Sequence, residues 1–217
     1  MTPNFDYERE ASGVVAGVDE AGRGPLAGPV VAAAVILPLD PALVPEGIDD
    51  SKVLTALQRE ELYPLIFAVA QVGVGVASVK EIDRWNILRA SLLAMRRAVL
   101  ALPHLPALAL IDGNQLPRLP CAARAIVDGD ALCTSIAAAS IIAKVHRDRL
   151  MDRLARRHRG YGWEHNRGYA SAEHRAALQS LGVTKHHRRS FCSVREALGL
   201  EPELPFAITA ERSAEST

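Results

Sequence analysis

Short apolar runs, bounded by glycine and proline, predict the strands of this chain. Residues 13–19 and 29–37 are rich in valine and isoleucine and are separated by a Gly/Pro-rich turn, which predicts two strands paired as in a hairpin. Residues 72–79 alternate between small and β-branched positions, and the runs at 107–111 and 124–127 are short and apolar. These three segments are therefore expected to be strands as well.

Helical patterns fill most of the remaining chain. Thr55 is followed three residues later by Gln58, a capping-box pattern that opens a helix over 55–70, and Pro64 should kink or split that helix. Further helices are expected over residues 82–102 and 134–158, from about Ser171, and over 194–198. Strands come first, then helices alternate with strands, and only helices follow. This order predicts an α/β fold with a mixed β-sheet flanked by helices and a helical C-terminal portion.

Composition agrees with a globular protein. Hydrophobic residues make up 49% and charged residues 23% of the chain, and no apolar run approaches the roughly 18 residues that a membrane span needs. The N-terminus is polar and acidic, unlike a signal peptide. The three cysteines, Cys121, Cys133 and Cys192, form no CxxC pair, which argues against a disulfide framework and a cysteine zinc site. We expect a cytoplasmic protein in which residues 13–204 form one domain and residues 205–217 a disordered tail.

The formal net charge of zero hides an asymmetry. Residues 144–195 hold 13 Lys/Arg against 4 Asp/Glu, a balance of +9, and six of the seven histidines, so the rest of the chain has a balance of −9. Such a block is typical of a surface that binds a polyanion. A solvated helix face with internal salt bridges would have the same composition, so composition alone leaves both interpretations open.

Three of the predicted strands end in carboxylates beside or near glycine. Val18 leads into Asp19 and Glu20, Ile111 leads into Asp112, and Val127 leads into Asp128-Gly129-Asp130. Neighbouring strand ends can bring such groups together, and clustered carboxylates need a cation to stay ionised. Magnesium prefers oxygen ligands, and a pair of ions can activate water and stabilise the leaving oxygen of a phosphodiester. Each segment by itself is also an ordinary turn sequence.

Two details of the first strand end affect this hypothesis. Adjacent strand residues point to opposite faces, so Asp19 and Glu20 should share a site only if the strand breaks at Glu20. The following residues, 21–25, make such a break plausible. Gly22 and Gly24 would let backbone amides approach a sugar hydroxyl or a phosphate, to which Arg23 adds charge.

At this point the residues resemble those of the type 2 ribonuclease H family, ribonuclease HII, over about residues 13–199. The matching motifs, in chain order, are Asp19-Glu20-Ala21-Gly22-Arg23-Gly24-Pro25-Leu26, Asp50-Ser51-Lys52, Asn86-Ile87-Leu88, Ile111-Asp112-Gly113-Asn114, Gly129-Asp130, the segment from Ala138 to Val145, Arg147-Asp148, Gly168-Tyr169 and the segment from His186 to Phe191. A single motif could occur by chance, but the ordered set is specific.

The resemblance implies a ribonuclease H-like fold that uses Mg2+ or Mn2+. It implies an endonuclease that hydrolyses the RNA strand of RNA–DNA hybrids, leaving 3′-hydroxyl and 5′-phosphate ends, and that nicks DNA 5′ to a single embedded ribonucleotide. The catalytic and metal-binding residues that it implies are Asp19, Glu20, Asp112 and Asp130. Candidate substrate contacts are Gly22, Arg23, Gly24, Ser51, Lys52, Lys144, Arg147, Arg167, Tyr169, Lys185, Arg188 and Arg189.

The sequence departs from the family pattern at two positions. Asp128 stands where a lysine is common, which makes it a rival to Asp130, although position favours Asp130. Arg167 stands in a segment where a His-Lys pair is common, and it keeps the positive charge. We expect His186 and His187 to be structural or to contact the backbone. Residues 137–142, Ser140 among them, should pack against the sheet, and Trp85 and Trp163 should pack in the core or at its edge.

Two other classes of protein share parts of this pattern. A nucleic-acid-binding module without catalysis would use the basic block but not the acidic strand ends. A metal-dependent phosphohydrolase for small molecules would use the carboxylates but not the basic block. We expect a monomer whose substrates are RNA–DNA hybrids and DNA that contains ribonucleotides.

Overall fold

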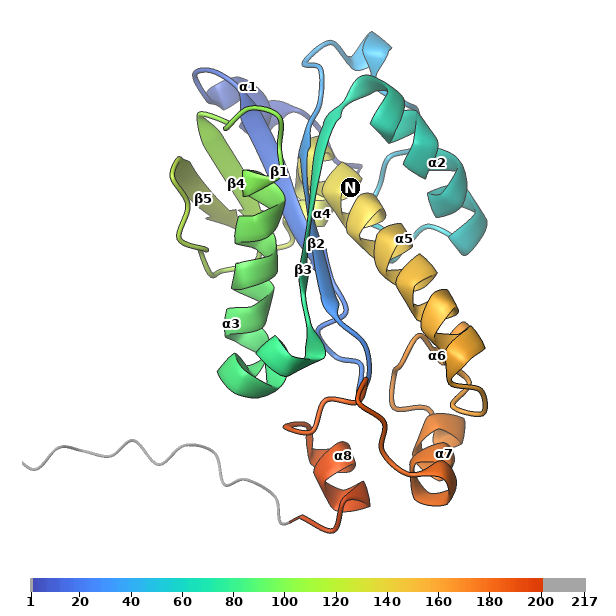
Figure 1. Cartoon of the computed structure of the whole chain (residues 1–217). Coiled ribbons are helices and arrows are strands. Elements are labelled where there is room, and N and C mark those ends of the chain that lie inside the picture. Colours follow the sequence, from blue (N-terminus) through green and yellow to red (C-terminus); the bar gives the residue numbers. More distant parts are fainter. Residues whose placement is uncertain (1, 201–217) are drawn as a thin grey trace, which may run out of the picture.

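The computed structural model describes residues 2–200, and within them five strands form one mixed sheet in the order β3-β2-β1-β4-β5 (Figure 1). Strand β2 is antiparallel to both of its neighbours, whereas β1, β4 and β5 are parallel. The predicted hairpin of the first two strands and the three later strands are confirmed. The strands are β1 (Val15–Ala21), β2 (Val30–Ile36), β3 (Gln71–Ala77), β4 (Leu108–Asp112) and β5 (Ala122–Ile126).

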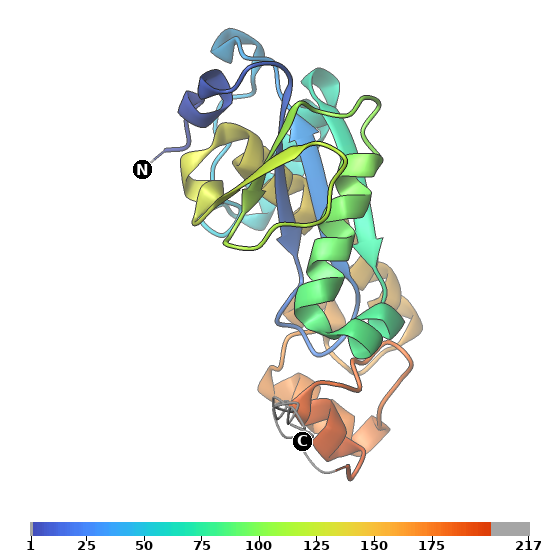
Figure 2. The same ribbon diagram turned by 90° about the vertical axis from the view of Figure 1, so that its left-hand side faces the viewer.

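Helices cover both faces of this sheet. Helix α3 (Val79–Leu100) packs on one face, and α5 (Thr134–Arg157) and α2 (Ala56–Val69) pack on the other (Figure 1). Helices α7 (Ala172–Leu181) and α8 (Cys192–Ala197) lie beyond one end of the sheet, which confirms the helical C-terminal portion (Figure 2). Short helices missed by the sequence analysis are α1 (Asp6–Glu10), η1 (Pro41–Leu43), α4 (Gly129–Leu132) and α6 (Trp163–Asn166).

Helix α5 lies unusually close to strand β1. A Cβ atom at Gly17 would overlap the backbone of Ser135 and Ile136, so glycine is required there. The helix residues 137–143 are buried and mostly alanine, as expected for a helix pressed onto a sheet. This close packing fixes the face of β1 on which Asp19 lies.

Local signals predicted helix starts better than helix interruptions. The capping box of Thr55 and Gln58 is present at the start of α2. The helix nevertheless continues through Pro64, so of the predicted kink or split the split does not occur. Pro64 is exposed, which leaves water free to bind the carbonyl that the missing amide would have bonded. The interruption occurs instead in α3, where Asn86 has φ 65° and joins two helical pieces across a kink.

No helix in the described part of the chain is long and apolar enough to cross a membrane. The tail predicted for residues 205–217 lies outside the described residues.

Candidate active site

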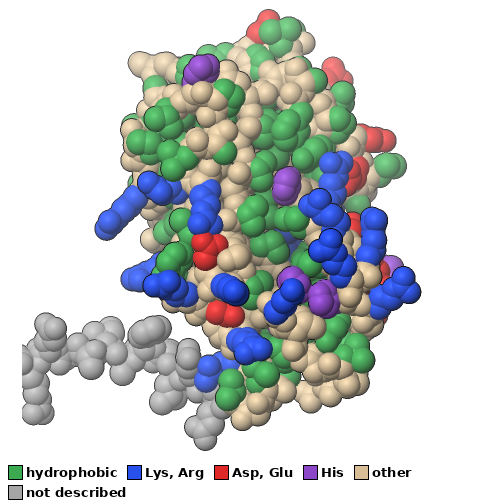
Figure 3. All heavy atoms as spheres, viewed as in Figure 1, with side chains coloured by type: hydrophobic (Ala, Val, Ile, Leu, Met, Phe, Trp, Pro, Cys, Tyr) green, Lys and Arg blue, Asp and Glu red, His purple; other side chains and the backbone are tan. Residues whose placement is uncertain are grey.

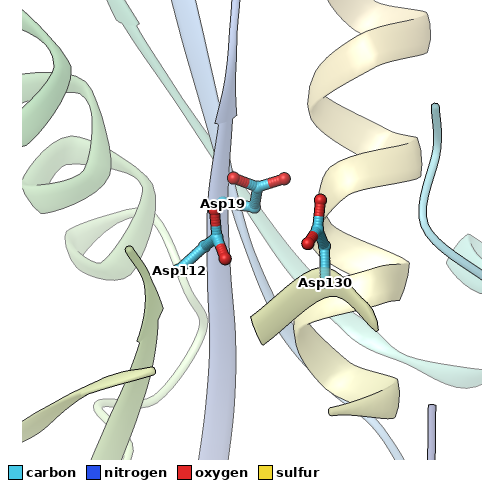
Figure 4. A group of neighbouring side chains, drawn as sticks. All are labelled: Asp19, Asp112 and Asp130. Atoms are coloured by element: carbon cyan, nitrogen blue, oxygen red, sulfur yellow. The ribbon is translucent and has the colours of Figure 1, made fainter. Parts of the chain in front are cut away.

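The sheet register brings Asp19 and Asp112 together. Val18 pairs with Ile111 across the parallel strands β1 and β4, so Asp19 and Asp112 follow one position later on adjacent strands. Val18 and Ile111 belong to the core under α3. Because side chains alternate along a strand, both aspartates point to the opposite face, toward α5 (Figure 4).

Asp130 completes the cluster from a short helix rather than from a strand end. Strand β5 ends at Ile126, Asp128 turns the chain with φ 54°, and Asp130 lies in the first turn of α4. The amide of Gly129 donates to Asp112 Oδ1 at 2.8 Å, which ties this turn to β4. Asp130 is only 4% exposed.

One carboxylate oxygen from each of Asp19, Asp112 and Asp130 lies within 4.8 Å of the others (Figure 4). Asp128 is exposed and lies outside this group. The choice of Asp130 over Asp128 is therefore supported by position in space as well as in sequence.

Glu20 reaches the same pocket by a different route from the one predicted. Strand β1 does not break at Glu20 but continues in register to Ala21, so the predicted break was wrong. Strand β4 ends at Asp112, so β1 has no β4 partner beside Glu20. Glu20 lines the pocket together with Asp19 and Asp112, and it receives a bond from Arg23 at 3.3 Å. Its other oxygen, Oε2, is buried without a hydrogen-bond partner among the described residues.

The protein environment resists ionisation of this cluster. Burial raises the pKa of Asp19 well above its ordinary value, and the charges of Glu20 and Asp112 raise it further. Burial and the charge of Asp130 raise the pKa of Asp112. Burial also raises the pKa of Glu20, although Arg23 opposes the shift. A bound cation would relieve both causes, because it replaces lost hydration and neutralises the repulsion.

Lys52 supplies one positive charge at the edge of the cluster. Its ammonium contacts Asp130 Oδ2 and lies 3.6 Å from Asp50. Burial alone would lower the pKa of Lys52, but the carboxylates of Asp130, Asp50 and Asp19 raise it above its ordinary value. Ser51 is buried beside it, and its amide donates to Ser140 Oγ at 3.2 Å, which holds the loop against α5.

The carboxylates open into a pocket of about 500 Å3. Its lining includes most of the substrate contacts predicted from the sequence: Gly22, Arg23, Gly24, Ser51, Lys52, Lys144, Arg147 and Tyr169. Tyr169 is 49% exposed. Its ring lies beside Gly24, at ordinary contact distance from where a Cβ atom would stand. These features leave room for a ligand beside Asp19, Glu20 and Asp112, which line the pocket.

Two arginines predicted to contact phosphate are buried instead. Arg188 is fully buried, and its guanidinium donates to the carbonyls of Gly22, Arg23, Gly28 and Pro29. Its charge therefore holds the loop after β1 and is not available to a substrate. The prediction failed because sequence alone does not show which arginine of a basic block turns inward.

Arg147 is buried like Arg188 but also lines the pocket. It is 1% exposed and donates to the carbonyls of Ala27 and Pro29, yet it lines the pocket. Gly22 has φ +96°, and a Cβ atom there would collide with the Arg147 side chain. The glycine at position 22 is therefore required by the fold, whatever further role it has.

The other basic residues predicted to contact the substrate differ in whether they form ion pairs within the protein. Lys144 pairs with Asp148 at 2.9 Å, and Arg167 pairs with Asp152 and lies 3.9 Å from Asp148. Arg167 does not line the pocket around the aspartates. Lys185 and Arg189 are exposed.

The predicted structural residues are structural. His187 is buried, with its Nε2 3.0 Å from that of His174, and Trp163 is fully buried and donates to His174. Ser140 donates to the carbonyl of Ala137. Trp85 is 38% exposed, so of the two predicted alternatives, core or edge packing, it does not lie in the core.

A mixed sheet with helices on both faces, and three aspartates converging where β1, β4 and α4 meet, defines a metal-dependent nuclease of the ribonuclease H type. Comparisons with known proteins narrow this class. The family model described as Ribonuclease HII matches residues 16–194. The chain belongs to the ribonuclease HII family, whose members cleave RNA in RNA–DNA hybrids.

Individual relatives agree with this assignment. The chain is 59% identical to Ribonuclease HII of Granulibacter bethesdensis over 205 residues, which cover 93% of this chain and 94% of the relative. It is 60% identical to Ribonuclease HII of Ruegeria pomeroyi over 200 residues, covering 89% and 85%. The crystal structure of ribonuclease H2 from Pyrococcus horikoshii superposes with a TM-score of 0.69 at 29% identity, covering 85% of this chain and 96% of that one.

Proposed function

We propose that Asp19, Asp112 and Asp130, with Glu20 beside them, hold the divalent ions of a ribonuclease HII endonuclease. Three observations support these ligands: the 4.8 Å cluster, the unpartnered buried oxygen of Glu20, and the raised pKa values that a cation would lower. Oxygen-only donors suit Mg2+ or Mn2+. When bound, such ions supply an activated water and charge stabilisation at the leaving oxygen, giving 3′-hydroxyl and 5′-phosphate ends.

We further propose that the pocket wall selects a ribonucleotide. Gly22, Arg23 and Gly24 line the pocket beside Glu20, where backbone groups can bond a ribose 2′-hydroxyl and the adjacent phosphate. The half-exposed ring of Tyr169 can pack on the next deoxyribose, where an added hydroxyl would clash. This arrangement favours DNA that contains a single ribonucleotide, nicked on its 5′ side, in addition to long hybrids. Ser51, Lys52 and Lys144 would contact phosphates at the same wall.

We infer that residues 13–200 form one catalytic domain that acts as a monomer; residues 201–204 of the predicted domain lie outside the described residues. The family match over residues 16–194 supports those limits. The three cysteines are free, which supports a reducing compartment such as the cytoplasm.

Hybrid cleavage with a chelator control tests the proposal. The wild-type chain should cut a labelled RNA–DNA hybrid with Mg2+ or Mn2+, lose activity with chelator, and leave pure DNA intact. Asp112→Asn should bind the hybrid but cut it about 100-fold to 1000-fold more slowly, because charge stabilisation in the transition state is lost. Cleavage of pure DNA, or full activity of Asp112→Asn, would contradict the assignment.

A further inference from the structure

A second basic surface lies outside residues 144–195, where the sequence placed the positive charge. It is a shallow groove of about 460 Å3 between the outer side of α3 and the loop that joins β4 to β5. Its walls include Trp85, Arg89, Leu92 and Arg96 from α3, and Leu116 and Arg118 from the loop. Arg96 Nε donates to the carbonyl of Arg118 at 3.1 Å, which holds the two walls together.

The charge of this groove is not neutralised by the protein. Arg84, Arg89, Arg96 and Arg118 are exposed, and none forms an ion pair with a carboxylate of residues 2–200. Lys and Arg side chains gather over α3 and beside it on this face of the molecule (Figure 3). Three arginines of the groove without an ion pair, and Arg84 beside Trp85, are therefore available to an anionic partner.

The two nearby carboxylates are already committed to other groups. Glu81 pairs with Arg97 at 2.7 Å, and Asp83 accepts bonds from the amides of Arg189 and Ser190. Neither carboxylate forms an ion pair with an arginine of the groove. Arg147 and Arg188, by contrast, are buried on backbone carbonyls. Some arginines of the basic block 144–195 are therefore inaccessible, whereas those of the groove are accessible.

The groove also exposes an aromatic and apolar floor. Trp85 is 38% and Leu116 47% exposed, and the guanidinium of Arg84 lies 5.3 Å from the centroid of the Trp85 ring. An exposed aromatic ring among arginines is typical of surfaces that hold a sugar-phosphate backbone and stack a base or sugar. A purely solvated helix face would not need an exposed tryptophan.

The groove is within reach of a substrate that occupies the active site. Its loop wall belongs to the segment that follows Asp112, and Arg118 lies six positions after Asp112 in the chain. An extended chain spans at most about 3.5 Å per residue, so the two positions lie within about 21 Å of each other. Asp112 points toward α5 and the groove lies on the α3 side, so a hybrid held at Asp112 has to pass the end of the sheet to reach the groove. One turn of a duplex is about 34 Å long, which exceeds the separation of the two positions.

We propose that this groove binds the sugar-phosphate backbone of the hybrid substrate at a distance from the cleaved bond. Arg89, Arg96 and Arg118 contact phosphates, and Trp85 packs against a sugar or a base. The proposal rests on the hybrid being the substrate. An acidic peptide would satisfy the same charges, but the substrate is favoured because binding at the active site raises its local concentration beside the groove.

The test measures binding of a long labelled RNA–DNA hybrid in chelator, where no cleavage occurs, over a range of salt concentrations. The variant is Arg89→Glu combined with Arg118→Glu. The matched control is Arg9→Glu, an exposed arginine of α1 that lies outside the basic block 144–195 and makes no ion pair within residues 2–200. The double variant should bind more weakly, and its log–log salt slope should be shallower by about 0.9 for each lost phosphate contact. The control should keep the wild-type slope.

Two further readouts separate this proposal from the cleavage function. The chain has two tryptophans, and Trp163 is fully buried, so hybrid binding should change the fluorescence of Trp85 and the change should be absent in Trp85→Phe. A short hairpin hybrid that covers only the active site should be bound and cleaved equally by the double variant and wild type.

Three results would overturn the proposal. The first is an equal salt slope for wild type and the double variant on the long hybrid. The second is an equal defect of the double variant on the short hairpin, which would place the effect at the active site. The third is a Trp85 signal that responds to an acidic peptide but not to the hybrid, which would assign the groove to a protein partner.

Discussion

Replacement of Arg188 tests whether a buried arginine, rather than a phosphate contact, organises the loop after β1. The guanidinium donates to the carbonyls of Gly28 at 3.0 Å, Arg23 at 2.7 Å, Gly22 at 2.5 Å and Pro29 at 3.3 Å. Burial lowers the pKa of Arg188 to about 9, which still leaves it charged at neutral pH. Arg188→Met keeps much of the apolar stem but removes all four hydrogen bonds, and of the four carbonyls Pro29 keeps its bond from Arg147 Nε.

The expected cost follows from these bonds. At about 1 kcal/mol net for each hydrogen bond, Arg188→Met should lower the free energy of unfolding by about 4 kcal/mol. For a chain of this size that corresponds to a fall in Tm of about 8–16 °C. Arg188→Lys should recover little, because an ammonium cannot reproduce the planar fork of donors.

Urea and thermal unfolding of Arg188→Met, with Arg189→Met as the matched control, measure this effect. Arg189 is the next residue and is exposed, so its replacement should change stability by no more than about 0.5 kcal/mol. The reasoning would be refuted if Arg188→Met unfolded like wild type while its hybrid binding became less dependent on salt. That result would mean that Arg188 contacts phosphate after all.

Four further predictions concern the active site and its support. Asp19→Asn should stabilise the metal-free protein at neutral pH, because the raised pKa of Asp19 means that wild type loses stability as pH rises through that pKa. In chelator, the difference in unfolding free energy between Asp19→Asn and wild type should therefore shrink as pH falls toward about 3.9, the pKa of an unfolded aspartate. A difference that does not depend on pH would contradict this. Asp130→Asn should cut hybrid cleavage about 100-fold or more, whereas Asp128→Asn should change it little; the reverse order in a cleavage assay would identify Asp128 as the ligand. Glu8→Ala should lower the free energy of unfolding, measured in urea, by about 1–2 kcal/mol, because Glu8 Oε1 accepts from the Ser135 amide at 2.8 Å and caps α5. Glu10 is exposed, so Glu10→Ala is the control, and equal effects of the two substitutions would argue against the cap. Tyr169→Ala should reduce cleavage at a single ribonucleotide in DNA more than cleavage of a long hybrid; a loss that only follows the loss of folded protein would exclude a reading role.

The sequence by itself determined the elements whose signals are local. The capping box at Thr55 depends on residues three positions apart, and the start of α7 at Ser171 is equally local, so both were predictable. The alternation of apolar runs and turns was sufficient to predict all five strands. The acidic residues at the strand ends made Asp19 and Asp112 candidates, and the family resemblance selected them. The parallel register of β1 and β4 then places the two side by side.

Only the tertiary structure decided which charged side chains are exposed to a substrate and which are buried. Arg188 and Arg189 are adjacent in sequence, yet one is fully buried on backbone carbonyls and the other is exposed. Glu20 shares the pocket although β1 continues past it, because β4 ends at Asp112 and leaves that side of β1 unpaired. The groove at Trp85 forms where a loop from the β4–β5 connection meets α3. Burial and strand ends depend on residues far apart in the chain, so no local pattern contains them.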